Sequence, residues 1–299
     1  MSDTATPSPD RRTPALDTTT VQHLRSWVGR TEGLTDDIHR YPVAAMAATL
    51  NRDDGEAHEL PSLWHWLFFL PQHRQDELGE DGHARRGGFL PPVPLPRRMW
   101  AGGRLSWAPS NPLLVGQHIR RRSEIASVEH KAGRSGELVF VTARHEVTNQ
   151  AGLALSEEHD IVYRAAPRPG DPVPAPVPAE TGAAWQRELR ADPVLLFRYS
   201  ALTFNGHRIH YDRSYVTGVE GYPGLIVHGP LIATLLVDLL RSHAPDARLL
   251  SFEFRAVRPT FDIHPFRLNG QPSADGKTVR LWAQDHEGFL TMHATATLA

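Results

Sequence analysis

The residues best suited to chemistry form a polar cluster in the second half of the chain, Asn205, His207 and His210. An imidazole with an ordinary pKa of ~6.5 can both take and give a proton near neutral pH, so His210 is the candidate general acid and base. The amide of Asn205 cannot act as a base, but it can orient a water molecule because it both donates and accepts hydrogen bonds. A cap or turn residue in the loop is the alternative role for Asn205. The cluster therefore predicts proton transfer assisted by a positioned water.

A buried helix beginning at Gly229 is the element that must position this cluster. Between residues 230 and 240 only Thr234 and Asp238 interrupt a run of apolar side chains, so a helix here is apolar on nearly all sides and has to be buried. Pro230 suits a helix start because its φ angle is already helical and it needs no amide partner. The unpaired amides of a first turn attract developing negative charge. We therefore expect the Gly229 N–H group to stabilise an oxyanion, with a plain helix cap as the alternative.

Residues 200–212, SALTFNGHRIHYD, resemble the active-site motif of the MaoC-like, R-specific enoyl-CoA hydratases. The branch that they match contains 3-methylfumaryl-CoA (mesaconyl-C4-CoA) hydratases, itaconyl-CoA hydratases and mitochondrial-type hydroxyacyl-thioester dehydratases. In this comparison His210 takes the place of the family's catalytic histidine, and Asn205 takes the place of an aspartate. The Val-His-Gly triplet at 227–229 matches the start of the family's central helix. The motif thus indicates a family, and the replaced aspartate selects the branch.

Four further residues acquire roles through this resemblance, because His207, Arg208, Val227 and His228 would contact the substrate. Arg208 would pair with a carboxylate or a CoA phosphate by a two-pronged contact, and a solvated arginine is the alternative. His228 would line the pocket or hydrogen-bond a carbonyl group. His207, His210 and His228 could also ligate zinc, which needs three or four such donors. Because the family's motif works without a metal, we expect no metal here.

These residues predict reversible hydration of a carbon–carbon double bond conjugated to a CoA thioester. Water is held by His210 and Asn205, and negative charge collects beside Gly229. The resemblance favours a C5 dicarboxylic substrate, 3-methylfumaryl-CoA hydrated to citramalyl-CoA, and implies no cofactor. A (3R)-hydroxyacyl-thioester dehydratase of fatty acyl chains is the first alternative. A hot-dog thioesterase and a non-catalytic acyl-CoA-binding subunit also stay open, the latter because of the missing aspartate.

The chain contains two copies of one outline, in which an apolar segment is followed by several β-type runs. In the first half the apolar segment is Leu63–Leu70, which we expect to form a short helix after Pro61. Strands are expected where alternating patterns are separated by Gly, Asn and Pro turn signals. The predicted strands are Arg97–Trp107, Gln117–His130, Glu137–Val147 and Leu153–Tyr163, then Leu249–Arg258, Pro265–Gln271, Thr278–Gln284 and Phe289–Leu298. Each half is thus a buried helix with a sheet, and two such units suggest duplication of one fold.

The repeat and the resemblance together predict an α+β double hot-dog fold, in which two antiparallel sheets each wrap a central helix. We expect a disordered N-terminus over residues 1–18, because Thr, Pro, Ser and Asp dominate there. A degenerate hot-dog half follows over residues 19–165, and it would shape the acyl pocket. Residues 166–184 are rich in proline, which is typical of an extended linker. The catalytic hot-dog half takes residues 185–299.

Composition limits the remaining function classes. The formal net charge of −2 gives no reason to expect nucleic acid or an anionic membrane as partner. The chain has no cysteine, which excludes disulfides, thiolate nucleophiles and iron–sulfur clusters. The N-terminus shows no apolar signal segment, and the apolar run after Gly229 is too short to span a bilayer, so we expect a cytoplasmic protein. A double hot-dog chain can act alone or pair as a homodimer, and the sequence leaves both open.

Overall fold

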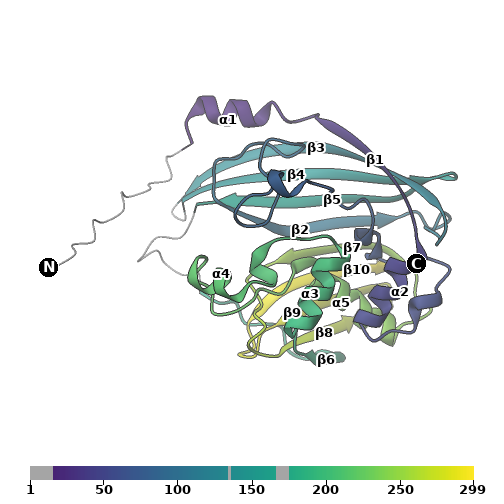
Figure 1. Ribbon diagram of the computed structural model, residues 1–299. Coiled ribbons are helices and arrows are strands. Elements are labelled where there is room, and N and C mark those ends of the chain that lie inside the picture. Colours follow the sequence, from purple (N-terminus) through teal and green to yellow (C-terminus); the bar gives the residue numbers. More distant parts are fainter. Residues whose placement is uncertain (1–15, 134–135, 166–174) are drawn as a thin grey trace.

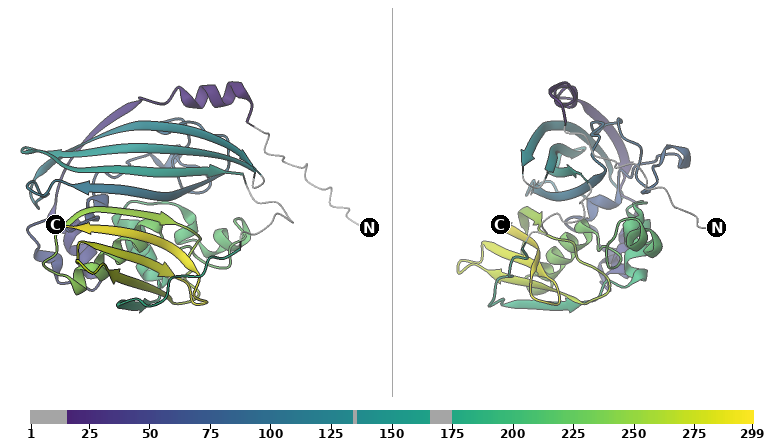
Figure 2. Two further views of the ribbon diagram at one scale, coloured as in Figure 1. Left: turned by 180° about the vertical axis from the view of Figure 1, so that it is seen from behind. Right: turned by 90° about the vertical axis from the view of Figure 1, so that its left-hand side faces the viewer.

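The computed structural model describes residues 16–133, 136–165 and 175–299. These residues form one antiparallel sheet of ten strands. The longest helix, α5 (Gly229–His243), packs against the strands of the second half (Figure 1). The sheet curls in each half, as the side view shows (Figure 2). Each half thereby has an inner face that can hold a core or a cavity.

Eight of the ten observed strands agree closely with the predicted ones. The strands are β1 (Thr31–Asp37), β2 (Arg97–Trp107), β3 (His118–Gly133), β4 (Gly136–Asn149), β5 (Gly152–Arg164), β6 (Trp185–Leu189), β7 (Leu249–Ala256), β8 (Phe266–Pro272), β9 (Thr278–Gln284) and β10 (Leu290–Leu298). The other α-helices are α1 (Thr18–Arg25), α2 (Arg40–Thr49), α3 (Pro193–Leu202) and α4 (Arg213–Gly218). The 3-10 helices are η1 (Asp54–Glu56), η2 (Trp64–Leu67), η3 (Gln75–Glu77) and η4 (Arg208–His210). Only the edge strands β1 and β6 escape the sequence pattern, since both are short and largely polar.

Strand order repeats between the halves and joins them in one sheet. The order is β1-β3-β4-β5-β2-β7-β10-β9-β8-β6, so each half arranges its strands in the same way. At the seam, β2 pairs with β7 in antiparallel register from Gly102 opposite Arg255 to Ser106 opposite Ser251. Gly102 is needed there because any side chain would clash with the Phe254 carbonyl. The two predicted units are present, but their sheets are continuous.

The second half is built around α5, as predicted. Residues Leu231–Leu240 are all buried in this helix. Its buried carboxylate, Asp238, lies 3.2 Å from the Arg52 guanidinium of the first half. Arg241, also on α5, pairs with Asp54 at 2.6 Å. Arg52 and Asp54 of the first half therefore connect that half to α5 through ion pairs.

The first half departs from the prediction, because no helix comparable to α5 covers its sheet within residues 19–133 and 136–165. The segment Leu63–Leu70 forms only the single 3-10 turn η2. Leu63 and Phe69 adopt left-handed backbone angles, φ 70° and 56°, which interrupt the helical path on both sides. Pro61 and Pro71 bracket the segment and leave no room for extension. The predicted helix is therefore wrong. His65 and Trp66 of η2 contact β5, and the inner face of this sheet stays open only in its middle part, which lines a cavity.

Two apolar clusters flank the open face. The larger one surrounds α5 and includes Leu105, Val147 and Leu155 of the first half. The smaller one joins Leu24 of α1 to strand residues such as Tyr163. Between the two clusters the inner face carries polar side chains, which belong to the site described below.

Residues 1–15 of the predicted disordered segment 1–18 and residues 166–174 of the predicted linker 166–184 lie outside the described residues. In the described part, α1 already starts at Thr18, and the Asp17 side chain caps it by accepting from the Thr20 amide at 2.7 Å. Residues 175–184 run beside β10, where the Leu290 amide donates to the Val177 carbonyl at 2.8 Å. Among the helices that can be described, none has the length and apolarity needed to cross a bilayer.

Candidate active site

A cavity of about 1110 Å³ lies between the two halves and contains the predicted catalytic residues. Asn205, His207, His210 and Gly229 all line it. The second half supplies the loop after α3 and the start of α5. The first half supplies inner-face residues of β2 to β5 and parts of the segment 65–84. The space that the predicted chemistry needs is thus open and shared by both halves.

A turn after α3 delivers Asn205 to the cavity. Phe204 has a left-handed φ of 48°, and the Asn205 amide donates to the Ser200 carbonyl at 2.8 Å. The Asn205 side-chain Oδ1 accepts a hydrogen bond from the His207 amide at 3.0 Å. Its Nδ2 group makes no hydrogen bond within the described part of the chain. Asn205 therefore holds the turn through its oxygen, and its nitrogen is available to a water or a substrate.

His210 is oriented by one backbone hydrogen bond. Its Nδ1–H group donates to the Ile226 carbonyl at 2.7 Å, and since a carbonyl can only accept, Nε2 is left as the basic nitrogen. Burial lowers the pKa of His210 to about 4, against the opposing effect of the Ile226 hydrogen bond. The imidazole is therefore neutral at pH 7 and suited to accept a proton from water.

His228 supports His210 from behind and does not line the cavity. It is fully buried, and its ring stacks on that of His210 with centroids 3.7 Å apart. Its Nε2 is hydrogen-bonded to the Ser200 hydroxyl at 2.8 Å, and burial lowers the pKa of His228 well below 6.5. The cavity wall includes Val227 and Gly229 but not the residue between them. The predicted substrate contact is therefore corrected for His228, whereas Val227 faces the cavity as expected.

Gly229 has the geometry expected of an oxyanion donor. It is the first residue of α5, and its N–H group makes no hydrogen bond within the described residues. A Cβ atom at this position would meet nothing within 4 Å, so the space in front of the helix start is open. The helix dipole adds positive potential at the same point. A thioester oxygen placed there would be stabilised as negative charge develops.

Arg208 is held by protein groups. Its Nε and Nη2 atoms donate to one oxygen of Asp212 at 3.0 and 2.7 Å, and Nη1 donates to the Glu80 carbonyl at 3.1 Å. The guanidinium also lies over the Tyr215 ring, 4.1 Å from its centroid. Asp212 in turn caps α4 by accepting from the Tyr215 amide at 3.0 Å. Arg208 therefore braces the loop of residues 203–212, which we call the catalytic loop. The predicted contact of Arg208 with a substrate carboxylate or phosphate would require these bonds to break.

A first-half segment, residues 79–83, closes over the catalytic loop. The Arg208 amide donates to the Asp81 carbonyl at 2.9 Å. Gly82 has a φ of 85° and packs so closely on the Gly206 carbonyl that any side chain would clash. The ring of His83 lies 4.0 Å from that of His207. The active site is thus completed by a loop that lies more than a hundred residues away in the sequence.

A group of three residues, Asp81, His83 and His207, is where this site could hold a metal. Their donor atoms lie within 4.8 Å of one another, and His83 Nδ1 donates to the Asp81 carboxylate at 3.1 Å. Burial lowers the pKa of His207 to about 2, so its ring has a free lone pair. The positive charge of Arg98 lies near enough to lower the pKa of both histidines further, and that charge would oppose a bound cation. This grouping differs from the His207, His210 and His228 trio considered from the sequence.

A second polar group lies on the inner face of the first-half sheet. We call it the inner-sheet polar patch, and it consists of Arg121 on β3, His145 on β4, and Glu157 and His159 on β5, all lining the cavity. Glu157 accepts hydrogen bonds from His65 Nε2 and Trp66 Nε1, both at 3.0 Å. Burial acts to raise the pKa of Glu157, but the hydrogen bond from His65 and the charges of the surrounding histidines together outweigh it, and the pKa is about 2. Glu157 is therefore ionised, and each of its carboxylate oxygens already accepts a hydrogen bond.

Two arginines of the cavity wall make no hydrogen bond to a carboxylate within the described residues, Arg98 on β2 and Arg121 in the polar patch. For Arg121 the contact with Glu32 is 3.8 Å, which is too long for a hydrogen bond. The Arg121 Nε atom is buried without a partner, and the guanidinium lies 5.1 Å from the centre of the Phe69 ring. Unpaired guanidinium groups inside a cavity indicate that a ligand brings an anionic group.

Sequence reasoning found the second-half residues of the site and missed those of the first half. Asp81 and His83 lie in a loop with no recognisable motif. The polar patch did leave a signal, because His145, Glu157 and His159 occupy inward positions of predicted strands where alternation favours apolar side chains. Polar residues at such positions are a sign of a lined cavity.

Comparisons with known sequences agree with this geometry. The family model described as hydroxyacyl-thioester dehydratase type 2 matches residues 63–262. The mesaconyl-C(4)-CoA hydratase of Chloroflexus aurantiacus is 48% identical over 279 residues, which are 91% of this chain and 97% of that protein. The mitochondrial hydroxyacyl-thioester dehydratase type 2 of Schizosaccharomyces pombe is 26% identical over 266 residues, 79% of this chain and 88% of that protein.

Comparisons with solved structures confirm the predicted double hot-dog fold. A MaoC-like dehydratase from Phytophthora capsici has a TM-score of 0.63 at 14% identity, covering 93% of this chain and 98% of that one. A Mycobacterium tuberculosis protein described as having a double hotdog fold has a TM-score of 0.51 at 15% identity, with 91% and 96% covered. At these identities the likeness concerns the fold alone.

Proposed function

The chain belongs to the hydroxyacyl-thioester dehydratase type 2 family, and on that premise we propose that it is a hydro-lyase that hydrates 3-methylfumaryl-CoA reversibly to citramalyl-CoA. The observation that carries the proposal is its near full-length relationship to a mesaconyl-C(4)-CoA hydratase. The site supports it, because a neutral imidazole, a water-orienting amide and an unpaired helix amide line one cavity. His210, Asn205 and Gly229 take these three roles.

In the hydration direction, Nε2 of His210 takes a proton from a water that Asn205 orients, while the water oxygen bonds to the β-carbon. The electron pair of the double bond moves toward the thioester oxygen, where the Gly229 amide and the α5 dipole stabilise it. The α-carbon then takes a proton from the His210 imidazolium, and the thioester carbonyl re-forms. A pKa of about 4 makes this imidazolium a stronger acid than an ordinary one, so one residue can serve both proton transfers.

Most of the exposed lining of the cavity is apolar, but the arginines in its wall favour a dicarboxylic substrate over a fatty acyl chain. A site for a fatty chain would be expected to be apolar, whereas this cavity contains Arg98, Arg121 and the histidines of the polar patch. Dehydration of (3R)-hydroxyacyl thioesters with fatty chains is the second candidate. The family description and the Schizosaccharomyces pombe relative favour it.

Neither of the other two alternatives fits the site as well. A thioesterase usually has a carboxylate where Asn205 stands, and the carboxylate of Asp81 is bonded to His83. A non-catalytic binding subunit would not need an oriented base beside an unpaired helix amide. We further propose that the reaction needs no cofactor and takes place in the cytoplasm, where the chain acts alone or as a homodimer.

Assays with three thioesters test the proposed reaction. The purified protein is mixed with 3-methylfumaryl-CoA, crotonyl-CoA and a long-chain trans-2-enoyl-CoA, and enoyl-thioester absorbance and free thiol are followed together. We expect the fastest loss of absorbance with 3-methylfumaryl-CoA and no thiol release. Release of thiol would establish a thioesterase instead, and a preference for the long chain would establish the fatty acyl alternative.

The His210→Ala variant tests the mechanism in the same assay. Because general acid–base catalysis contributes about 10²- to 10⁴-fold, we expect kcat to fall by that factor. The matched control is His118→Ala, since the His118 side chain is 60% exposed on β3 and pairs only with Asp37. Near wild-type turnover by the His210 variant would refute the assigned base.

A further inference from the structure

The inner-sheet polar patch occupies the place where a hot-dog unit holds its central helix. In the second half α5 covers this face with apolar side chains, whereas in the first half η2 is one turn and the patch faces the cavity. Apolar side chains flank the patch along the same strands, Val147 and Leu155 toward one end and Val141 and Tyr163 toward the other. Polar groups inside an apolar core cost free energy unless they find partners. The patch therefore indicates a bound polar group.

Arg121 has the least satisfied charge in the patch. Its side chain is only 23% exposed, and its contact with Glu32 is 3.8 Å. Glu157 cannot compensate it through a hydrogen bond, because His65 and Trp66 already hold both carboxylate oxygens. Burial lowers the pKa of Arg121, although Glu32 and Glu157 oppose this effect. A carboxylate ligand would supply the two parallel hydrogen bonds that neither Glu32 nor Glu157 makes.

The two histidines of the patch are suited to assist an anion without adding charge. Burial lowers the pKa of His145 to about 4 and the pKa of His159 to about 3, so both rings are neutral at pH 7 and each carries one N–H group. His145 Nδ1 is hydrogen-bonded to the Ser123 hydroxyl at 2.8 Å. The His159 ring packs on Trp100 with centroids 3.7 Å apart. These contacts fix both rings in the cavity wall.

We propose that Arg121 binds the free carboxylate of a dicarboxylic acyl-CoA substrate and that the inner-sheet polar patch thereby selects this substrate class. The inference rests on the proposed function, because Gly229 would hold the thioester oxygen and His210 would face the β-carbon. The free carboxylate of this substrate is attached to the β-carbon, and in the proposed pose it lies on the side of the first-half sheet. Trp66 and Trp100 line the same cavity and give the acyl group apolar walls. The first half would choose the substrate that the second half converts.

Arg98 is the rival for this role. It also lines the cavity, but it lies near the Tyr163 hydroxyl and adds its charge beside His83 and His207. That position is outside the polar patch. Separate substitution of the two arginines distinguishes them.

Steady-state kinetics of the full chain with two thioesters test the proposal. The variants Arg121→Met, Arg121→Lys and Arg98→Met are compared with the control Arg122→Met. Arg122 is the next residue on β3, and its side chain is 51% exposed and pairs with Glu124 at 2.9 Å. We expect Arg121→Met to lower kcat/KM for 3-methylfumaryl-CoA by about 100-fold or more, because a buried polar site loses its partner. Its kcat/KM for crotonyl-CoA should stay within about threefold, because this thioester has no second carboxylate. Arg121→Lys should lie in between, since it keeps the charge without the planar fork, and Arg122→Met should match wild type.

Crotonyl-CoA turnover reports whether each variant is folded, and Arg121→Lys supplies the comparison if Arg121→Met does not fold. Equal losses for both thioesters would make Arg121 a structural residue and overturn the proposal. Loss of 3-methylfumaryl-CoA turnover in Arg98→Met but not in Arg121→Met would overturn it in favour of the rival. A wild-type protein that hydrates crotonyl-CoA but not 3-methylfumaryl-CoA would refute the proposed substrate and this inference together. A wild type that prefers the dicarboxylic thioester beside an unimpaired Arg121→Met would refute the inference alone.

Discussion

At the scale of single residues, the imidazole that we propose as the base belongs to a stack of two neutral rings. His228 lies face to face with His210 at 3.7 Å, so protonating both rings would place two positive charges in contact. The Ser200 hydroxyl fixes His228, and the Ile226 carbonyl fixes His210. His228 is therefore a positioning residue that keeps its neighbour available as a base.

The pH dependence of activity should reveal this arrangement. Since burial lowers the pKa of His210 to about 4, the neutral base persists through pH 6 and is lost only as the pH falls toward 4. We expect kcat/KM for hydration to be level between about pH 6 and 8 and to decline below about pH 5, because kcat/KM reports the free enzyme. Initial rates across this range provide the measurement, and assays after return to pH 7 control for acid unfolding. A decline centred near pH 6.5 would show an ordinary, solvated histidine.

The residue-level predictions succeed where one local motif decides the outcome and fail where packing decides it. His210, Asn205 and Gly229 line one cavity, and all three belong to the single stretch that runs from the end of α3 to the start of α5. Whether the residue before Gly229 points to the cavity or to the core depends on the packing of α5, so the sequence could not place His228. Arg121 enters the site from a strand of the other half, and a local pattern carries no information about such a contact.

At the scale of elements, the contrast between α5 and η2 determines where the cavity lies. α5 has 15 residues and a continuous buried stretch, whereas η2 has four residues between Pro61 and Pro71. A segment this short covers only part of a sheet, and the middle of the first half's inner face consequently lines the cavity. The prolines made this foreseeable, since the residue before a proline is disfavoured in a helix.

The contact between the 79–83 segment and the catalytic loop should be tested at Gly82. A Cβ atom there would clash with the Gly206 carbonyl, and the left-handed φ adds strain. We expect Gly82→Ala to displace the loop, to lower kcat about tenfold or more, and to destabilise the fold by more than the ~1–2 kcal/mol of a left-handed alanine. Initial rates and urea unfolding measure the two effects.

Gly288→Ala is the matched control for this experiment. Gly288 has nearly the same φ, 89°, but nothing lies within 4 Å of its Cβ position. It should show the backbone cost alone and leave kcat unchanged. Equal behaviour of the two variants would mean that the close approach of the two loops has no role in the site.

At the scale of the whole molecule, one continuous sheet and buried ion pairs join the halves. The β2–β7 seam and the Arg52–Asp238 contact cross between them. The interior strands were predictable because alternation marks a half-buried surface. Their joining into one sheet was not, because pairing between distant strands depends on the assembled fold. The edge strands were not predictable either, since β1 is mostly exposed.

Stability toward acid should reflect the histidines that are buried in and behind the cavity wall. Burial lowers the pKa of six of them, His83, His145, His159, His207, His210 and His228. Below the unfolded pKa of about 6.5 the unfolded chain binds protons that the folded chain does not. The contribution of these histidines to the free energy of unfolding is therefore at its maximum above that pH and decreases between pH 6.5 and 4. For His145, a pKa of about 4 corresponds to roughly 3 kcal/mol.

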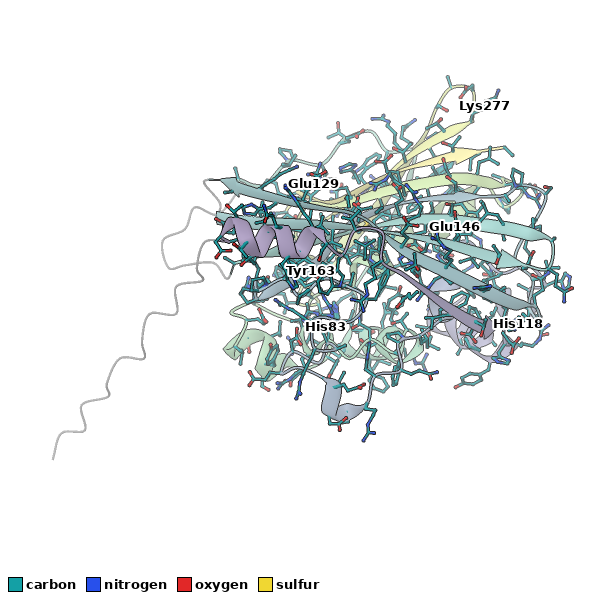
Figure 3. All side chains as sticks on the ribbon, turned by 90° about the horizontal axis from the view of Figure 1, so that it is seen from above. His83, His118, Glu129, Glu146, Tyr163 and Lys277 are labelled. Atoms are coloured by element: carbon teal, nitrogen blue, oxygen red, sulfur yellow. The ribbon has the colours of Figure 1, made fainter. Side chains whose placement is uncertain are left out.

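Thermal unfolding between pH 7.5 and 4.5 measures this effect. We expect Tm to drop steeply below pH 6.5 and His145→Gln to lessen the slope. His118→Gln should leave the slope unchanged, because His118 is exposed at the opposite end of the sheet from His83 and Tyr163 (Figure 3). A Tm that stays constant down to pH 5 would contradict the burial of neutral imidazoles.

The uncovered inner face of the first half has a consequence for how such enzymes diversify. A duplicated ancestor would begin with two equivalent helices, and losing one of them frees a chamber without touching the machinery retained in the other copy. Mutations in the emptied copy can then alter what is accepted, while selection preserves the reaction in its twin. Paralogues that descend from one fusion can therefore differ in substrate while they catalyse the same reaction.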